Sequence, residues 1–213
     1  THHASLYMHI ELTEMLRCPE PHREEFLVLS TSEMNGRMVW IGLVGCPVCH
    51  RNFEIIDGVV DFSEVVTGER QLRAVRRTPA PESPVLLDPQ SLQALLELSG
   101  PGGYIVLVGS AARLAEGLAG LMGGVHFVGI NAPPDVEELP VLTLLQTDRV
   151  IPLRQAMARG VVVGAELART PWVAEGVRVL LSGRRLVIED EQAAPAGLKK
   201  LASGQGVWVG EKP

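Results

Sequence analysis

The chain of 213 residues contains three cysteines, and all three lie in two short clusters that also contain histidine. Cys46 and Cys49 are separated by two residues, a spacing that allows two thiolates to bind one metal ion from a tight turn. Cys18 and His22 form the other cluster, upstream in the sequence. Together the four side chains could complete the tetrahedral shell that zinc prefers. We therefore predict a structural zinc site with the ligands Cys18, His22, Cys46 and Cys49.

The fourth ligand is the open question of this prediction. Position 21 holds Pro21, so the first cluster lacks the second cysteine of a Cys-x-x-Cys pair. His22 is the first choice, because its spacing from the upstream cysteine lets both side chains converge from one turn. His50 comes second, since it directly follows a cysteine and its side chain would point away, and His9 and Glu20 are more distant choices. The alternative without a metal is a set of ordinary reduced cysteines, because an odd count disfavours a disulfide framework.

The residues after the second cluster favour a β-hairpin. We expect a strand over residues 51–56, a turn at Asp57 and Gly58, and a second strand at 59–60. The second pair of metal ligands would thus lie directly before a hairpin.

This arrangement resembles the Trm-type zinc-ribbon family, small proteins or modules that accompany methyltransferases. The second knuckle of that family runs C-x-x-C-G-R-x-F/Y-x-I-x-D-G-I-P, and residues 46–60 are similar to it. Residues 11–17 look like the short helix that precedes the family's first C-P-x-C, with Leu12, Met15 and Leu16 on its inner face. The resemblance covers residues 9–62 and departs from the family at Pro21 and at Val60, where the family has proline. It implies a zinc-ribbon module at this end of the chain.

Composition and charge limit what the whole chain can do. With 46% hydrophobic residues, a chain of 213 residues can bury one full core and a small module. No apolar run is long enough to span a bilayer, and we expect a cytoplasmic protein. Residues 1–68 carry 4 Lys and Arg against 10 Asp and Glu, whereas residues 69–213 carry 15 of each kind. An acidic ribbon repels a phosphate backbone, so we expect a protein partner or a second copy of the chain rather than nucleic acid.

A basic segment and a proline-rich segment separate two predicted domains. Arg70, Arg73, Arg76 and Arg77 could attract nucleic acid from one helix, but we interpret this segment as a solvated helix that leads into a linker. Three prolines within residues 79–84 mark the boundary. We predict a zinc-ribbon domain, a linker and a Rossmann-like domain at residues 9–66, 67–87 and 88–213.

Downstream of the linker, helices alternate with short apolar strands. Continuous apolar runs are typical of strands that are buried on both faces of a parallel sheet. We expect helices and strands to alternate along this region, with helices at 92–98, 111–122 and 171–181, and strands at 104–108, 125–130, 141–146, 160–164, 185–190 and 206–210. This alternation predicts an α/β fold with a Rossmann-like, mostly parallel sheet.

Three segments of this region resemble class I S-adenosylmethionine-dependent methyltransferases. Residues 95–109 resemble the helix, P-G-G turn and first strand that lead into the cofactor loop. Residues 146–153 resemble the D-A-x-x-L-P-F segment, and residues 173–189 resemble the R-V-L-R-P-G-G-R-L-V-I helix and strand. The segments occur in the order of the family. The resemblance implies S-adenosylmethionine as the cofactor, with Asp148 near its adenine.

The residues around the expected cofactor depart from that family. Its loop pattern is acidic-x-G-x-G-x-G, and alignment on Gly109 places Leu107, Ala111 and Arg113 at the acid and the two further glycines. Asn131 stands where a carboxylate should accept hydrogen bonds from both ribose hydroxyls. An amide can bind one hydroxyl but loses the charge-assisted pair, a loss of about 1 kcal/mol or more. The cofactor motif is therefore degenerate, which disfavours S-adenosylmethionine as a ligand.

Two functional hypotheses follow. The first is a zinc-binding protein whose methyltransferase-like domain serves as a non-catalytic binding or scaffolding module. The alternative is an active S-adenosylmethionine-dependent methyltransferase with an atypical loop. We assign no catalytic residue: Glu166 has the position of a carboxylate at a helix start, and His126 that of a core histidine. The residues that could contact the cofactor are Gly109, Ser110, Asn131 and Asp148.

Overall fold

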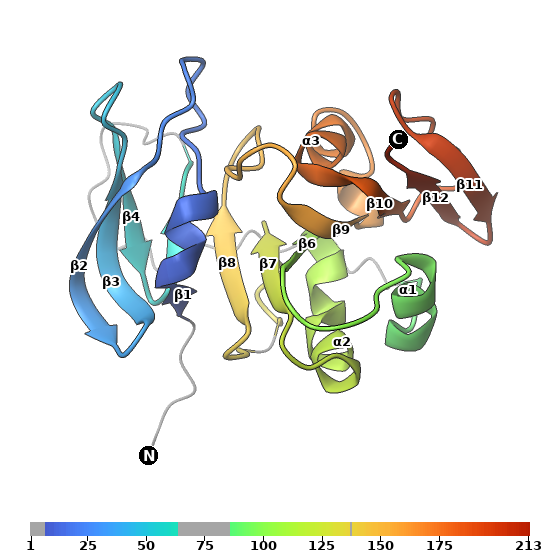
Figure 1. The fold of residues 1–213 in the computed structure, drawn as a ribbon, viewed down its shortest axis with the longest axis horizontal. Coiled ribbons are helices and arrows are strands. Elements are labelled where there is room, and N and C mark those ends of the chain that lie inside the picture. Colours follow the sequence, from blue (N-terminus) through green and yellow to red (C-terminus); the bar gives the residue numbers. More distant parts are fainter. Residues whose placement is uncertain (1–6, 64–85, 137) are drawn as a thin grey trace.

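The fold is described from a computed structural model for residues 7–63, 86–136 and 138–213. Within these ranges, 12 strands form one sheet in the order β1-β3-β4-β5-β8-β7-β6-β9-β10-β12-β11, with β2 paired to β3 (Figure 1). The strands are β1 (Met8–His9), β2 (Val28–Asn35), β3 (Met38–Gly45), β4 (Asn52–Ile56), β5 (Val59–Asp61), β6 (Tyr104–Val108), β7 (His126–Ile130), β8 (Leu142–Gln146), β9 (Ala158–Val163), β10 (Leu180–Ile188), β11 (Lys199–Gly204) and β12 (Val207–Glu211).

The C-terminal part of the sheet is mostly parallel. Strands β8, β7, β6, β9 and β10 pair in parallel, and β12 pairs antiparallel with β10 and with β11. Successive strands from β6 to β8 move to one side of β6, and β9 then returns to its other side. The direction of winding therefore reverses at β6, as in a doubly wound sheet. The predicted α/β fold with a Rossmann-like, mostly parallel sheet is confirmed.

Helices cover both faces of this sheet (Figure 1). Residues of α1 and α2 belong to one hydrophobic cluster, and those of η1 and α3 are buried in another. None of the helices in the described ranges has the length and apolar character needed to cross a membrane. The helices are η1 (Ile10–Met15), α1 (Pro89–Leu95), η2 (Gly109–Leu114), α2 (Ala115–Leu121), η3 (Ala165–Leu167) and α3 (Trp172–Val179), the η elements being 3₁₀-helices.

The alternation of side chains along β6 explains why both faces are covered. Ile105 and Leu107 pack in the cluster with α1 and α2, whereas Val106 and Val108 pack in the cluster with η1 and α3. Successive side chains of a strand point to opposite faces, and here both faces are apolar. A strand of this composition requires cover on each side.

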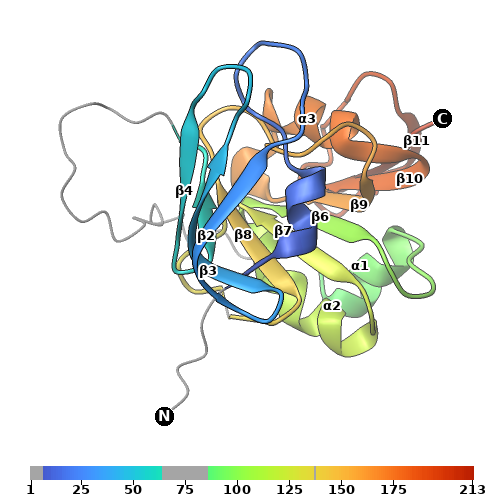
Figure 2. The same cartoon turned by 60° about the vertical axis from the view of Figure 1, so that its left-hand side comes forward.

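The N-terminal part of the chain, described over residues 7–63 and called the ribbon below, continues the same sheet. Strands β2, β3, β4 and β5 pair antiparallel in sequence, and Asp57 and Gly58 form the predicted turn between β4 and β5 with positive φ angles of 49° and 73°. Strand β5 then pairs in parallel with β8, with Val60 opposite Leu145. Figure 2 shows the strands β2, β3 and β4 on the β8 side of the parallel sheet. The ribbon therefore covers the edge of the parallel sheet.

A second backbone contact ties the ribbon to the loop after β8. Leu16 and Leu153 form an isolated antiparallel bridge. Two hydrogen bonds flank this bridge. On one side the Arg17 N–H donates to the Pro152 carbonyl at 3.1 Å, and on the other side the Arg154 N–H donates to the Met15 carbonyl at 2.8 Å. The segment that precedes the first cysteine thus runs against the segment that resembles the D-A-x-x-L-P-F sequence.

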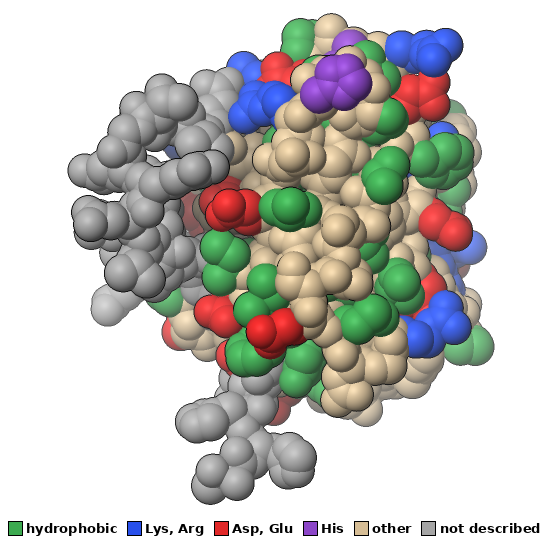
Figure 3. All heavy atoms as spheres, turned by 90° about the vertical axis from the view of Figure 1, so that its left-hand side faces the viewer, with side chains coloured by type: hydrophobic (Ala, Val, Ile, Leu, Met, Phe, Trp, Pro, Cys, Tyr) green, Lys and Arg blue, Asp and Glu red, His purple; other side chains and the backbone are tan. Residues whose placement is uncertain are grey.

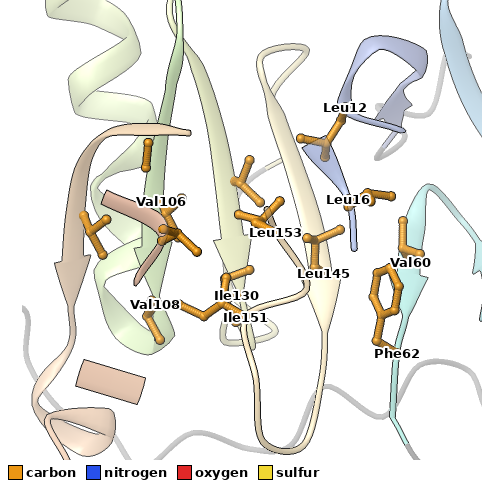
Figure 4. Close-up of a cluster of buried hydrophobic side chains, with 14 of the residues drawn as sticks. Leu12, Leu16, Val60, Phe62, Val106, Val108, Ile130, Leu145, Ile151 and Leu153 are labelled. Carbon is orange, nitrogen blue, oxygen red and sulfur yellow. The ribbon is translucent and has the colours of Figure 1, made fainter. Parts of the chain in front are cut away.

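One hydrophobic core joins the two parts. Leu12 and Leu16 from the ribbon are fully buried together with Ile151 and Leu153 from the loop after β8. Figure 4 shows these side chains beside those of β6, β7 and β8, with Phe62 and Val60 completing the same layer. The predicted domain boundaries remain a prediction, and the arginines of the basic segment lie outside the described residues.

Several boundaries differ from those expected. The helix predicted at 111–122 begins as a 3₁₀-helix directly after β6 and becomes α-helical only at Ala115. The strand predicted to begin at Arg185 begins at Leu180, with a register irregularity between these residues. The hairpin of β2 and β3 and the strand β11 were not predicted. Every residue of β11 is exposed, so it carries no apolar pattern from which a strand could be predicted.

Candidate metal centre and cofactor loop

The structure brings the four predicted metal ligands together. One ligand atom from each of Cys18, His22, Cys46 and Cys49 lies within 4.8 Å of the others. The Cys18 Sγ and Cys49 Sγ atoms are 3.7 Å apart, and the Cys46 Sγ and His22 Nε2 atoms are 3.4 Å apart. Two of the cysteines are buried, whereas Cys49 and His22 are half-buried.

The two pairwise distances, 3.7 Å and 3.4 Å, match edges of a tetrahedral zinc shell. With bonds of 2.3 Å to sulfur and 2.0–2.1 Å to nitrogen, a tetrahedron has edges of about 3.8 Å between two sulfurs and about 3.6 Å between sulfur and nitrogen. The two edges given above lie within about 0.2 Å of these values. Three thiolates and one imidazole are also a donor set that zinc commonly uses in structural sites. The residues present therefore fit the metal that the ribbon resemblance implies.

The turn after Cys46 is folded for this role. The Cys46 N–H donates to the Arg51 carbonyl at 2.8 Å, and its own carbonyl accepts from the His50 N–H at 2.9 Å. Burial disfavours the Cys46 thiolate, but the N–H groups of Cys49 and Val48 that bond its sulfur keep the pKa of this thiol below its usual value. Burial raises the pKa of the neighbouring thiol, that of Cys18, to about 12. A cation among these sulfurs would favour the thiolate form of both.

The orientation of His22 supports its choice over the other histidines. Its Nδ1 lies 2.7 Å from the Arg23 carbonyl, which fixes the ring with Nε2 toward the cysteine sulfurs. A metal-binding histidine commonly uses its second nitrogen in this way. His50 has a positive φ of 59° and an exposed side chain, and it is not part of the cluster.

The more distant alternatives have other partners. His9 stacks edge-on against His126 at a centroid distance of 4.8 Å, and Glu20 forms an ion pair with Arg51. His126 was expected to be a core histidine. It lies at the start of β7 and is half-buried rather than fully buried. Burial, and then the positive charge that His9 can carry, lower the pKa of this histidine.

The loop after β6 is closed by a carboxylate of the same chain. Ser110 is fully buried, and its N–H and its Oγ both donate to the side chain of Glu166, the latter at 2.7 Å. Gly109 has a φ of +66°, and a Cβ atom at this position would lie 2.1 Å from the Glu166 Oε1. Glu166 does lie in the first turn of a helix, η3, as predicted, but its carboxylate reaches across to the loop where the resemblance places the cofactor.

Asn131 is also engaged with backbone. It has a positive φ of 52°, its Nδ2 donates to the Thr147 carbonyl, and its Oδ1 accepts from the Thr147 N–H, both at 2.9 Å. The side chain of Asn131 thus joins the ends of β7 and β8 through two hydrogen bonds to one backbone residue. Asp148 directly follows Thr147 and is exposed. The amide predicted to bind a ribose hydroxyl therefore serves first to hold two loops together.

The remaining departures from the cofactor motif have structural roles. Leu107 and Ala111 are fully buried in the hydrophobic cluster beneath α1 and α2. Arg113 forms a bidentate ion pair with Asp135 at 2.8 and 3.0 Å. The cavity between them and α2 measures about 170 Å³, below the 300–1,000 Å³ of typical ligand sites. At the positions of the family's acid and two further glycines, this chain thus has two packed apolar side chains and one ion-paired arginine.

Glu189 was missed by the sequence prediction. It is the first residue after β10, its side chain is only 3% exposed, and it lines a cavity of about 470 Å³ together with Glu166. Burial raises the pKa of the Glu189 carboxyl, although the N–H groups of Leu86 and Ala165 oppose the shift. A carboxylate directly after an apolar strand of a parallel sheet was the signal that could have identified it.

Comparison with known proteins yields matches only among solved structures. No protein-family model and no curated protein matches the chain. A chain of the complex between the Haloferax volcanii Trm112 methyltransferase activator and a putative methyltransferase is similar at 15% identity over 47% of this chain and 50% of that chain, with a TM-score of 0.39. A putative methyltransferase from Bacillus halodurans C-125 is similar at 18% identity over 51% and 52% of the two chains, with a TM-score of 0.40.

A S-adenosylmethionine-dependent methyltransferase from Aquifex aeolicus is similar at 17% identity, over 59% of this chain and 88% of that chain, with a TM-score of 0.42. This chain spans about half the length of the first two structures named. The order and direction of the strands define the class of this protein. It has a Rossmann-like α/β fold joined to a module with a cysteine–histidine cluster that could bind a metal ion.

Proposed function

We propose that this protein binds zinc in its ribbon and that its methyltransferase-like domain works as a non-catalytic binding or scaffolding module. The observation that carries the proposal is the contact between Ser110 and Glu166. A loop that takes a cofactor must offer its N–H groups and an open approach to the backbone. Here an internal carboxylate uses both the N–H and the hydroxyl of Ser110 and fills the space beside Gly109.

The metal in this proposal is structural. Cys18, His22, Cys46 and Cys49 would supply all four ligands, and a closed shell of protein ligands leaves no position for a substrate or a water molecule. When bound, zinc would supply cross-linking between the segment before β2 and the turn before β4. The energy of that cross-link would add to folding, as it does in small zinc modules.

The ribbon surface supports a protein partner or a second copy of the chain. Exposed large hydrophobic side chains are more numerous here than on the rest of the described chain, and acidic side chains lie among them (Figure 3). Such a mixed apolar and acidic surface suits protein contact better than a phosphate backbone. The exposed hydrophobic residues of the ribbon are Phe26, Val28, Met34, Trp40, Leu43 and Val48. A cytoplasmic location belongs to the same proposal.

The alternative is an active S-adenosylmethionine-dependent methyltransferase. One observation favours it: Asp148 is exposed at the end of β8, where the resemblance places the adenine. For this alternative Glu166 would have to leave Ser110, and the ion pair of Arg113 with Asp135 would have to open. The cost of breaking these bonds would weaken cofactor binding.

The cofactor question is tested by calorimetric titration of S-adenosylmethionine and S-adenosylhomocysteine into zinc-replete full chain. We expect no heat for either ligand up to about 1 mM, which limits any binding energy to about 4 kcal/mol. The Glu166→Ala variant opens the loop, and Glu116→Ala, an exposed acid on α2, is the matched control. Micromolar binding to the unmodified chain would overturn the non-catalytic proposal.

The metal question is tested by counting zinc per chain by mass spectrometry of the purified protein. We expect one zinc in the unmodified chain, and a loss of most of it in Cys49→Ser and in His22→Ala. His50→Ala is the matched control, because its ring is exposed and outside the cluster. Full zinc content in His22→Ala together with loss in His50→Ala would show that the wrong histidine had been chosen.

A further inference from the structure

The second cavity lies at the carboxyl ends of β9 and β10, and Glu166 is one of the residues that line it. It measures about 470 Å³, within the range of small-molecule sites. Glu166 and Arg169 line it from the segment after β9, and Glu189, Asp190 and Glu191 line it from the segment after β10. The carboxyl ends of parallel strands are a common position for ligand sites in such sheets.

Glu189 has one side-chain oxygen without a hydrogen-bond partner among the described residues. Only 3% of Glu189 is exposed to solvent. Its Oε1 accepts the Leu86 N–H at 3.0 Å, but its Oε2 is buried without any hydrogen-bond partner in the described part of the chain. An unsatisfied buried polar group costs about 1–3 kcal/mol. A donor that entered the cavity would remove this cost.

The charge around Glu189 indicates what kind of donor fits. Four carboxylates and one guanidinium line the cavity among the described residues. One oxygen of Glu191 accepts the Gly206 N–H at 3.0 Å, and one oxygen of Asp190 accepts the Gln192 N–H at 2.9 Å. Each carboxylate has about four acceptor sites, so both side chains retain capacity for further donors. The lining therefore favours a ligand that is positively charged and rich in N–H groups.

A bare metal ion fits this cavity less well than an organic cation. Over the described ranges, Cys18, His22, Cys46 and Cys49 form the one group whose ligand atoms converge closely enough to hold an ion. The carboxylates of the cavity line a much larger volume. We propose that this pocket binds a small organic cation with a primary amine or guanidinium group, whose N–H donates to the Glu189 Oε2 while Asp190 and Glu191 balance its charge.

The proposal is tested by calorimetric titration of putrescine and agmatine into zinc-replete full chain. The uncharged diol 1,4-butanediol, which has the shape of putrescine without its charge, is the ligand control. We expect at least one of the two amines to bind with a dissociation constant below about 1 mM, and the diol not to bind. Glu189→Gln should weaken binding at least about tenfold, which is about 1.4 kcal/mol. Glu54→Gln, an exposed acid on β4, should leave the affinity unchanged.

Several outcomes would overturn this inference. These are no heat from either amine up to about 10 mM, equal affinity for the unmodified chain and Glu189→Gln, or equal binding of the diol. Tight binding of Mg²⁺ that depends on Glu189 and that the amines do not compete with would replace the organic cation by a metal. If Glu189→Gln does not fold, Asp190→Asn takes its place, with the same direction expected. Putrescine and agmatine carry no nucleoside, so their binding and that of S-adenosylmethionine can fail independently.

Discussion

Replacing Leu16 by alanine should show that the ribbon and the parallel sheet unfold as one unit. Leu16 is fully buried and faces Leu153 across the bridge between the two parts. Removal of a buried leucine side chain costs about 2–5 kcal/mol, because transfer energy is lost and a cavity remains. In a protein of this length that loss corresponds to a decrease in Tm of about 4–20 °C.

Three tryptophans allow each part to be followed separately. Trp40 lies on β3 of the ribbon, whereas Trp172 and Trp208 are buried within the described sheet region. Single-tryptophan variants should give coincident thermal and denaturant transitions, and Leu16→Ala should lower all of them together. Leu201→Ala is the matched control, because this side chain on β11 is 41% exposed. Its effect should stay within about 0.5 kcal/mol.

The reasoning would be refuted if the protein unfolded in two separated transitions and Leu16→Ala shifted only the transition that Trp40 reports. That result would mean that the shared core stabilises the ribbon alone, and that the predicted division into independent domains is correct. A decrease below about 1 kcal/mol would mean that the site collapses around the smaller side chain.

Three further predictions concern single sites. In a denaturant titration, Gly109→Ala should lower the free energy of unfolding by about 1–3 kcal/mol, because alanine is strained at this positive φ and its Cβ meets Glu166. The control is Gly120→Ala in α2, which has no atom near its Cβ and should raise the free energy of unfolding by about 0.5–1 kcal/mol. EDTA should lower Tm, since free zinc at about 1,000 times its dissociation constant adds about 4 kcal/mol; an unchanged Tm with all zinc removed would contradict a structural metal. Burial raises the pKa of Glu189, so the folded state holds this proton more strongly than the unfolded chain does. The stability that this group contributes therefore falls as pH rises above the usual glutamate pKa. Glu189→Gln should flatten the pH dependence of Tm above about pH 5, and parallel curves for the two proteins would refute this prediction.

The sequence was sufficient for the parts of the fold that follow from local pattern. Residues 105–108 and 127–130 form short runs without a polar side chain, and the structure buries them within β6 and β7. Asp57 and Gly58 specify their own turn, and Cys46 and Cys49 specify a turn with two convergent sulfurs. In each case the information lies within a few neighbouring residues.

The parts that were missed depend on residues far apart in the chain. Strand β2 has a polar, almost wholly exposed sequence, so only its pairing with β3 makes it a strand. The contact of Ser110 with Glu166 spans 56 positions, and neither residue alone indicates it. That cofactor binding is weakened stays a prediction from the sequence, and only the tertiary structure identifies Glu166 as the carboxylate that bonds the loop at Ser110.

The position of the ribbon links its metal to the rest of the molecule. Strand β8 would be the edge of the parallel sheet, and an unpaired edge invites association with other chains. Strand β5 covers that edge through only two pairs, Val60 with Leu145 and Asp61 with Gln146. So short a strand cannot hold its register by its own hydrogen bonds, because ordering each residue costs about 1–2 kcal/mol. The shared core at Leu16 and the proposed zinc cross-link would hold β5 in place, which is why the metal should affect the whole fold although it lies outside the parallel sheet.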